Sequence, residues 1–329
     1  MIDPRQVVAG LLGAIEWQNE VTGYCRCPGE ALHTSANGKK DCRVNVDAAP
    51  TIFCFHASCS VAVAEANRRL RRELSASTWE LRLPGGKLLR SGDVLQSSGV
   101  VLPREAVKAR AKAEGRDGSE VLLLESLRAA AERYKPELFE FFRWPMAQVL
   151  EDSPLLVANY EPEEQFRTWL KIWPADSTVW IGDVYSSGQP HHRTHFRPVA
   201  DWYQIGPVMG NYTCGSSFKP GTYSRSNESL NARRFMVIES DTLTHDEMGA
   251  VFAFLRRQLQ YEMHCIIDTA GKSLHGWFET PPNRIFEDRL KAGLEVFGCD
   301  PKVFKPAQPV RVPGAWRDGK LQRLIWLRR

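Results

Sequence analysis

The sequence of 329 residues predicts an α+β fold in three parts, covering residues 1–75, 76–149 and 150–329. Five of the eight cysteines fall within the first 59 residues, which indicates a small metal-binding module. Residues 104–143 are rich in Ala, Glu, Arg and Leu, which predicts a largely helical connector. Beyond residue 160, helical patterns alternate with short apolar runs, which predicts a sheet packed against helices.

The composition is that of an ordinary globular protein, with 43% hydrophobic and 25% charged residues and a net charge of +4. The chain has no uncharged apolar run of about 18 residues, so we expect no membrane partner. The N-terminus lacks the layout of a secretory signal, and we therefore expect a cytoplasmic protein.

The N-terminal part is expected to begin with an amphipathic helix over residues 5–20 and to end with a helix over residues 61–74. The second helix carries the cluster Arg68, Arg69, Arg71 and Arg72, either as a solvated face or as a phosphate-binding one. In the connector, we expect the helical pattern of residues 104–143 to break near Gly115 and Gly118.

The C-terminal part is expected to form strands over residues 178–185, 234–238, 263–267 and 275–279. Helices are expected over residues 161–172, 244–260 and 284–297, and residues 210–232 are expected to form a long loop. Thr244 and Glu247 have the spacing of a capping box. The order strand–helix–strand–strand–helix–strand is typical of a ferredoxin-like or RNA-recognition-like sheet.

Two carboxylates, Glu239 and Asp241, follow the apolar run that ends at Ile238. Residues i and i+2 of a strand point to the same side, so we expect both side chains to project together. Paired carboxylates suit Mg²⁺ or Mn²⁺, and two-metal nucleotidyl transfer requires such a pair. The alternative is a strand that ends in polar residues at the surface.

A glycine-containing turn lies between the next two expected strands. Gly271 permits close approach of a ligand, and Lys272, Ser273 and His275 are residue types that contact phosphates. Further along, Asp300 offers a third carboxylate. Arg311 and Arg317 are candidates to bind a triphosphate or a template backbone, or are surface charges.

These three pieces resemble the catalytic motifs of the archaeo-eukaryotic primase superfamily, in its primase-polymerase branch. The matching stretches are Glu239-Ser-Asp241, Ser273-Leu-His275, and Cys299-Asp300 leading to Arg311-Val-Pro-Gly314. The resemblance covers residues 150–329. It implies an RNA-recognition-like catalytic core and template-directed nucleotidyl transfer on single-stranded DNA, as in a DNA primase.

The resemblance also implies roles for individual residues. Glu239, Asp241 and Asp300 are implied to bind catalytic Mg²⁺ or Mn²⁺, and His275 to hold the phosphates of the nucleoside triphosphate. One position departs from the family, in which the first acidic residue is usually Asp, whereas this chain has Glu239. Asp268 is the alternative third carboxylate.

The cysteine cluster offers seven candidate zinc ligands between residues 25 and 59, and a tetrahedral Zn²⁺ needs four. The segment resembles the zinc ribbon of bacterial and phage primases, although both ligand pairs are more widely spaced. The favoured ligand set is Cys27, His33, Cys54 and Cys59, and the alternates are Cys42, His56 and Cys25.

Two other functions remain open at this stage. A primase relative that binds nucleic acid without catalysis would accommodate Glu239. A replication-initiator nuclease would use the histidines near His191, His192 and His195, although these follow a loop-like stretch. The chain has no Walker-type loop that opens a helix, so a primase of this kind is expected to work with a separate helicase.

Overall fold

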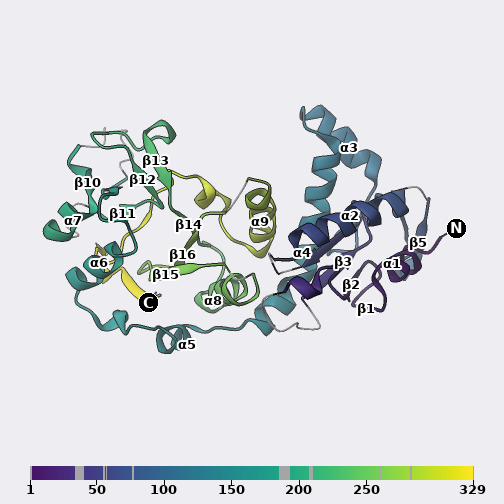
Figure 1. Ribbon diagram of the computed structural model, residues 1–329, viewed down its shortest axis with the longest axis horizontal. Coiled ribbons are helices and arrows are strands. Elements are labelled where there is room, and N and C mark those ends of the chain that lie inside the picture. The colour runs from purple at the N-terminus through teal and green to yellow at the C-terminus, as the bar shows by residue number, and fades with distance from the viewer. Residues whose placement is uncertain are drawn as a thin grey trace. The chain divides into compact units, whose positions relative to one another are not determined.

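The computed structural model describes residues 2–33, 41–54, 56, 58–75, 78–184, 193–206, 210–259, 261–281 and 284–328. The chain divides into two compact units, Met1–Pro136 with Gln258–Gln260, and Glu137–Arg257 with Tyr261–Arg329 (Figure 1). None of the helices in these described ranges has the length and apolar character needed to cross a membrane.

The first unit contains a four-stranded antiparallel meander of β1 to β4 in sequence order. Its elements are α1 (Pro4–Leu12), β1 (Ile15–Trp17), β2 (Thr22–Cys25), β3 (Cys42–Asn45), β4 (Thr51–Cys54), α2 (Ser60–Ser75), β5 (Glu80–Arg82), β6 (Leu88–Arg90), β7 (Val94–Leu95), β8 (Val101–Leu102), α3 (Arg104–Ala113) and α4 (Gly118–Phe141). The predicted helix over residues 61–74 and the break between α3 and α4 are confirmed. The helix predicted over residues 5–20 ends at Leu12, because Gly13 adopts a positive φ of 83° and the chain then enters β1.

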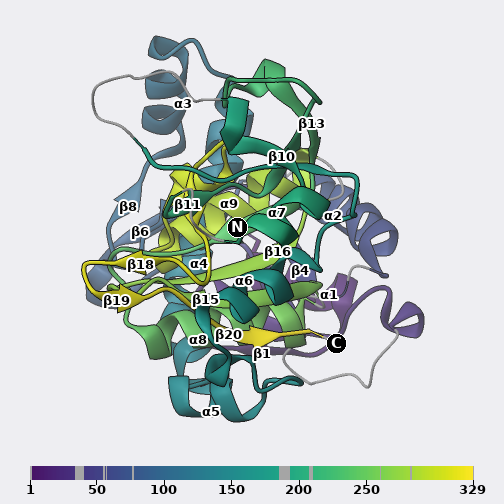
Figure 2. The ribbon, with the colours of Figure 1, turned by 90° about the vertical axis from the view of Figure 1, so that its left-hand side faces the viewer.

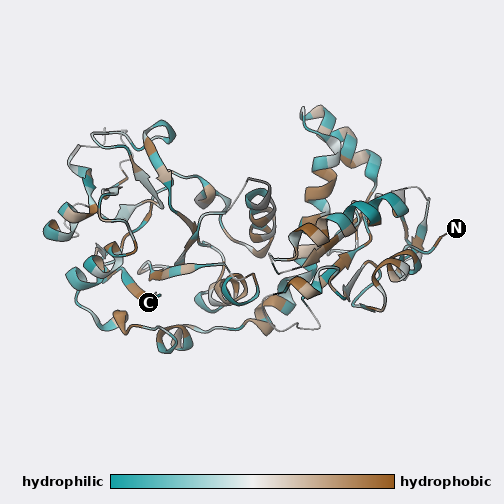
Figure 3. Ribbon diagram, in the orientation of Figure 1, coloured by the Kyte–Doolittle hydropathy of each residue, from teal (hydrophilic) through white to brown (hydrophobic). Residues whose placement is uncertain are grey.

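Helix α2 is fastened to the edge strand β4 by one side chain. The Asn67 amide accepts a hydrogen bond from Ile52 N at 2.6 Å and donates one to Ile52 O at 2.8 Å, so it pairs with the strand as a backbone would. Figure 3 shows hydrophobic and hydrophilic stretches along α2, whose buried face includes Leu70 and Leu74. The arginine cluster is divided: Arg71 donates to Pro50 O at 3.0 Å, whereas Arg69 and Arg72 are exposed.

Part of the predicted connector belongs to the first unit. Trp79, Leu81 and Leu89 lie in one buried cluster with Val44 and Leu70 of the cysteine-rich module. Along the chain, the boundary between the two compact units falls within α4, next to its internal Pro136, rather than at residue 75. The reason is hydrophobic: the β5–β6 hairpin completes the core that the small sheet and α2 leave open.

The second unit is built on the antiparallel sheet β14-β16-β15-β20 (Figure 2). The helices and strands of this unit are α5 (Met146–Glu151), α6 (Pro162–Leu170), β9 (Thr178–Trp180), β10 (Phe196–Pro198), α7 (Val199–Ile205), β11 (Tyr212–Thr213), β12 (Ser216–Phe218), β13 (Leu230–Arg233), β14 (Phe235–Ile238), α8 (His245–Ala253), β15 (Met263–Asp268), β16 (Leu274–Glu279), α9 (Arg284–Phe297), β17 (Val310–Arg311), β18 (Trp316–Arg317), β19 (Lys320–Leu321) and β20 (Arg323–Leu327).

The predicted succession of β14, α8, β15, β16 and α9 is present, and the sheet is completed by β20, which pairs with β15. In a ferredoxin-like sheet the fourth strand lies beside the first, so the topology differs in this respect. The long connection from α9 to β20, which contains three short strands, allows the chain to reach the other edge of the sheet.

Two element boundaries also differ from the predictions. Residues 210–232 are not one long loop, because they contain β11, β12 and β13, and β12 and β13 join β9 and β10 in a second four-stranded sheet. The predicted helix over residues 244–260 is α-helical only to Ala253 and continues as one π-helical turn, Phe254–Gln258. Its predicted capping box at Thr244 and Glu247 is confirmed.

Both faces of the β14-β16-β15-β20 sheet are buried, which explains why β14 is apolar at every position. On one face, Val237 and Trp277 pack in a cluster with Trp169 of α6. On the other face, Phe252 of α8 packs on Phe278. Gly276 permits this contact, since a Cβ there would lie 2.5 Å from a Phe252 ring atom.

Candidate functional site

Alternation along the strands brings Glu239, Ser273 and His275 to one face and one end of the sheet. In the β14–β16 ladder, Val237 lies opposite Trp277 and Ile238 opposite Gly276, so the next pair in this register is Glu239 and His275. Ser273 precedes His275 by two residues and therefore shares its face. The sequence motifs that are 34 and 36 residues apart thus meet because of the strand register.

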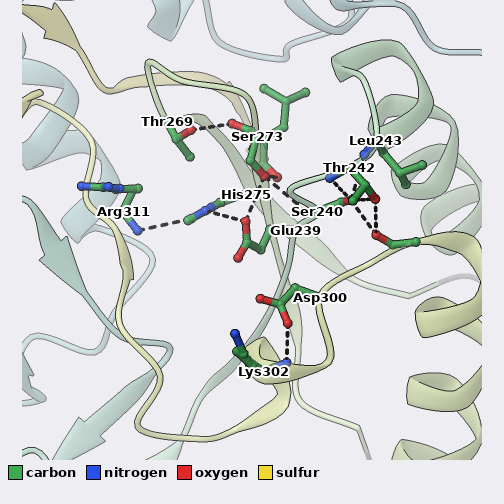
Figure 4. A network of polar contacts seen from close by, with 12 residues as sticks. Glu239, Ser240, Thr242, Leu243, Thr269, Ser273, His275, Asp300, Lys302 and Arg311 are labelled. Carbon is green, nitrogen blue, oxygen red and sulfur yellow. Dashed lines mark hydrogen bonds and ion pairs between the residues drawn. The ribbon is translucent and has the colours of Figure 1, made fainter. Parts of the chain in front are cut away.

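The three side chains form one polar network (Figure 4). Ser273 Oγ donates to Glu239 Oε2 at 3.0 Å, and His275 Nε2 lies 3.5 Å from the same oxygen. The backbone N–H of Arg311 donates to His275 Nδ1 at 3.2 Å. Because Nδ1 accepts this bond, the ring proton of the neutral histidine is on Nε2, facing Glu239.

The charge on Glu239 is supported by its surroundings. Burial by itself would raise the pKa of this carboxyl, but the hydrogen bonds from His275 and from the Ser273 hydroxyl and the charge of Arg311 outweigh it. The net effect is a lowered pKa, so Glu239 is an anion at neutral pH. Its side chain is only 16% exposed, which strengthens these interactions relative to water.

Asp300 is attached to the same segment through its backbone. Its N–H donates to the carbonyl of Glu239 at 2.9 Å, and its side chain accepts from Lys302 N at 2.8 Å. That second bond caps the short 3₁₀ helix Pro301–Phe304. Figure 4 shows the Asp300 carboxylate beside the Glu239 segment, so two of the three predicted acidic positions are neighbours.

Asp241 lies beyond the end of β14, in a bend, and its side chain is exposed. The residue between the two acids, Ser240, is fully buried and organises the bend. Its Oγ donates to Gly298 O at 2.5 Å and accepts from Thr242 N and Leu243 N at 3.1 and 3.0 Å. Ser240 was not identified from the sequence, where its position between two carboxylates was the available signal.

The three carboxylates are not gathered as a compact ligand set. In the described part of the chain, one group of potential metal ligands has all its ligand atoms within 4.8 Å of one another, and that group does not include these carboxylates. Glu239 is turned toward Ser273 and His275, Asp300 caps its own helix, and Asp241 faces outward. The Mg²⁺ or Mn²⁺ site therefore stays a prediction.

Asp268, the alternative third carboxylate, points to the other face of the sheet. It lies one residue beyond Ile267, which is opposite His275, and alternation turns it toward α8. It is 3.6 Å from Arg323 Nη2 and accepts from Ala270 N at 2.9 Å. This position separates Asp268 from Glu239.

The predicted phosphate-binding cations lie on segments around this end of the sheet. Arg311 stacks over the Tyr212 ring at 4.0 Å, and burial lowers the pKa of its guanidinium. Tyr212 is a contact that the sequence did not reveal. Lys272 is exposed at the β15–β16 turn, and Arg317 Nη1 is close to Gly271, 3.0 Å from the position that a Cβ would take.

The described ranges contain one group of Cys, His, Asp and Glu side chains arranged to hold a metal ion. It consists of Cys27, His33, Cys54 and Cys59, the set favoured from the sequence, with all four ligand atoms within 4.8 Å of one another. The distance of 3.5 Å between Cys54 Sγ and His33 Nε2 matches the roughly 3.6 Å expected for two ligands of one tetrahedral Zn²⁺. These residues can hold a metal such as zinc.

Local structure positions these four ligands. Cys54 ends β4 and Cys59 immediately precedes α2. Gly29 N donates to Cys27 Sγ at 3.4 Å, and a Cβ on Gly29 would lie 2.7 Å from Cys59 Cβ. Glycine is therefore required where the two ligand-bearing segments approach each other.

The electrostatics of the cluster favour a bound cation. A hydrogen bond from the Cys42 thiol is the largest influence on two ligands, lowering the pKa of Cys27 to about 6 and that of Cys54 to about 4. Burial raises the pKa of Cys59, which is close to both. Neighbouring thiolates repel each other, and a metal ion removes that repulsion and deprotonates the remaining thiol.

The alternate ligands surround these four. Cys42 Sγ lies 3.5 Å from Cys25 Sγ, and the His56 ring stacks on His33 with centroids 4.0 Å apart. A cavity of about 540 Å³ lined by Cys25, Cys27, His33 and Cys42 adjoins the cluster.

The histidines considered for an initiator nuclease are not seen as a group, since His191 and His192 lie outside the described residues. His195 bonds to Ile181 O at 2.8 Å and holds β10 to the end of β9. Comparison with known proteins gives no assignment: no family model, no curated protein and no solved structure matches this chain.

Proposed function

We propose that this chain is a nucleotidyltransferase of the primase type, which joins nucleoside triphosphates on a single-stranded DNA template. The observation that carries the proposal is the buried network of Glu239, Ser273 and His275, to which Asp300 is joined through the backbone. Three motifs that resemble those of the primase-polymerase branch therefore converge at one end of one sheet.

In this proposal each residue has a distinct task. Glu239, Asp241 and Asp300 hold Mg²⁺ or Mn²⁺, which supplies charge stabilisation for the displacement at phosphorus. His275 exchanges Glu239, the present partner of its Nε2 proton, for a phosphate oxygen of the incoming nucleotide, while the backbone N–H of Arg311 holds the ring at Nδ1. Lys272, Arg311 and Arg317 balance the triphosphate charge.

The first unit contributes a structural zinc in this proposal. Cys27, His33, Cys54 and Cys59 join β2, β4 and the start of α2 around one ion, in a module that serves as a zinc ribbon for template binding. A separate helicase supplies single-stranded template.

A second candidate is a primase-like protein that binds nucleic acid without catalysis. It is favoured by one observation, namely that the Glu239 carboxylate is already bonded to Ser273 and His275 while the three carboxylates are not gathered. This candidate retains the zinc module and loses only the metal chemistry.

Nucleotide incorporation distinguishes the two candidates. The full chain is incubated with Mg²⁺ or Mn²⁺ on primed and on unprimed single-stranded DNA, with ribo- and deoxynucleotides in parallel. We expect the wild type to incorporate nucleotides and Asp241→Ala and Asp300→Asn to lose this activity. The control Asp201→Asn, which changes an exposed acidic residue on α7, is expected to retain it. Incorporation that persists in Asp241→Ala refutes the two-metal assignment, and inactivity of the wild type under all these conditions favours the binding protein.

A further inference from the structure

A second site lies on the opposite face of the sheet from His275. An open cavity of about 450 Å³ is bordered by the β15–β16 turn, the β18–β19 hairpin and the beginning of α8. Its lining residues are His245, Asp268, Ala270, Gly271, Lys320, Leu321 and Arg323. The β15–β16 turn, which carries Ser273 and leads into His275 of β16, therefore borders both sites.

The charge around this cavity is predominantly positive. Lys320 and Arg323 line it, and Lys272 and Arg317 lie on the adjoining turn and hairpin. Two of these four cations are paired with acids, Arg323 with Asp268 at 3.6 Å and Arg317 with Asp318 at 3.5 Å, so Lys320 and Lys272 carry the net positive charge. The arrangement fits a ligand that carries several negative charges in a row.

The β18–β19 hairpin presents an aromatic side chain beside these cations. Trp316 is 60% exposed, and it pairs across the hairpin with Leu321 of the cavity wall. Figure 2 shows the hairpin as a yellow loop that extends outward from the strands of the sheet. An exposed tryptophan next to lysine and arginine is the combination that binds unpaired bases and their phosphates.

The turn of the hairpin has a defined geometry. Asp318 and Gly319 have φ values of 49° and 74°, as the two central residues of a type I′ turn require. The Asp-Gly sequence adopts this turn readily, and the turn places Trp316 and Lys320 on the two paired strands of the hairpin.

We propose that the β18–β19 hairpin and the adjoining cavity bind single-stranded DNA, with Trp316 stacked on a base and Lys320 and Arg323 on backbone phosphates. The choice of single-stranded DNA as the ligand rests on the proposed function, in which this surface holds the template strand. The strand passes over the β15–β16 turn, where Lys272 is exposed.

The test measures binding of a fluorescent oligothymidine to the full chain by anisotropy, without added divalent metal. Trp316→Ala is expected to weaken binding about fivefold or more, whereas Trp316→Phe keeps a stacking face and most of the affinity. Lys320→Gln is expected to reduce the slope of log affinity against log salt by about 0.7, the value for one phosphate contact on a single strand.

Matched controls are Tyr223→Ala, which removes another exposed aromatic ring, and Lys171→Gln, which removes an exposed cation on the far end of α6. Both are expected to bind as the wild type does. Equal losses in the control and test variants, or unchanged binding by Trp316→Ala and Lys320→Gln, overturn the proposal. Displacement of the oligonucleotide by polyglutamate as effectively as by unlabelled DNA also overturns it, because stacking then contributes nothing.

Nucleotide incorporation separates this inference from the proposed function. If the wild type incorporates no nucleotide while its DNA binding depends on Trp316 and Lys320, the enzyme assignment fails and the binding site stands. If incorporation depends on Asp241 while the Trp316→Ala variant binds DNA normally, the binding site fails and the enzyme assignment stands.

Discussion

Removal of the Ser273 hydroxyl tests the polar network at its centre. Ser273→Ala deletes the bond of 3.0 Å to Glu239 and leaves a 16% exposed carboxylate with one fewer donor. A hydrogen bond to a charged group contributes about 1.5–3 kcal/mol, so we expect the free energy of unfolding to fall by about 2 kcal/mol at pH 7. Urea denaturation followed by tryptophan fluorescence measures this change.

The pH dependence identifies Glu239 as the partner. The folded-state pKa of Glu239 is lowered from 4.5. The stability that the ionised Glu239 contributes is therefore fully present above pH 4.5 and is lost as the pH falls through the folded-state pKa. The destabilisation caused by Ser273→Ala is therefore expected to shrink in this acidic range. A double-mutant cycle with Glu239→Gln is expected to give a coupling of about 1 kcal/mol. A pH-independent loss, or a coupling near zero, refutes the reasoning.

Three further predictions concern the metal cluster, the histidine and the sheet. Cys54→Ala is expected to abolish the binding of one zinc per chain, as measured by metal analysis, and to destabilise the first unit, whereas Cys25→Ala is expected to retain the metal. Retention of zinc by Cys54→Ala contradicts the ligand set. His275→Gln is expected to lower nucleotide incorporation about 100-fold or more, because the donor to the phosphate oxygen is displaced, and an unchanged rate excludes that role. Gly276→Ala is expected to lower the free energy of unfolding, measured by thermal unfolding, by about 1–3 kcal/mol, because its Cβ would lie 2.5 Å from Phe252. Gly293→Ala in α9, whose Cβ would meet nothing within 4 Å, is expected to raise it by up to about 1 kcal/mol. Equal effects of the two changes contradict the packing argument.

Several elements followed from local sequence because their signals are local. The helix α9 matches its predicted range, and the capping box of α8 is present at Thr244 and Glu247. Side-chain periodicity and capping act within a few residues, so tertiary packing has little chance to alter them. The strands β11 to β13 were missed because they are short and largely polar, and because β11 is held by β17, a partner distant in sequence.

The metal-ligand set is the site prediction with the most direct structural support. Cys27, His33, Cys54 and Cys59 were favoured from the resemblance to a primase zinc ribbon, and the same four side chains come together in an arrangement that could hold a metal ion. The positions of Cys42 and His56 around them depend on β3 lying beside β4 and on the stacking of His56 on His33. No spacing rule contains that information.

The sequence by itself determined the residue types of both candidate sites, the order of strands and helices around the carboxylates, and the capacity for a Cys₃His metal site. Only the tertiary structure decided that Glu239 lies opposite His275, that Asp268 turns to the other face, and that Asp241 remains exposed. The physical reason is register. Alternation along a strand assigns faces locally, but the pairing of strands far apart in the chain is set by which apolar faces α6 and α8 bury.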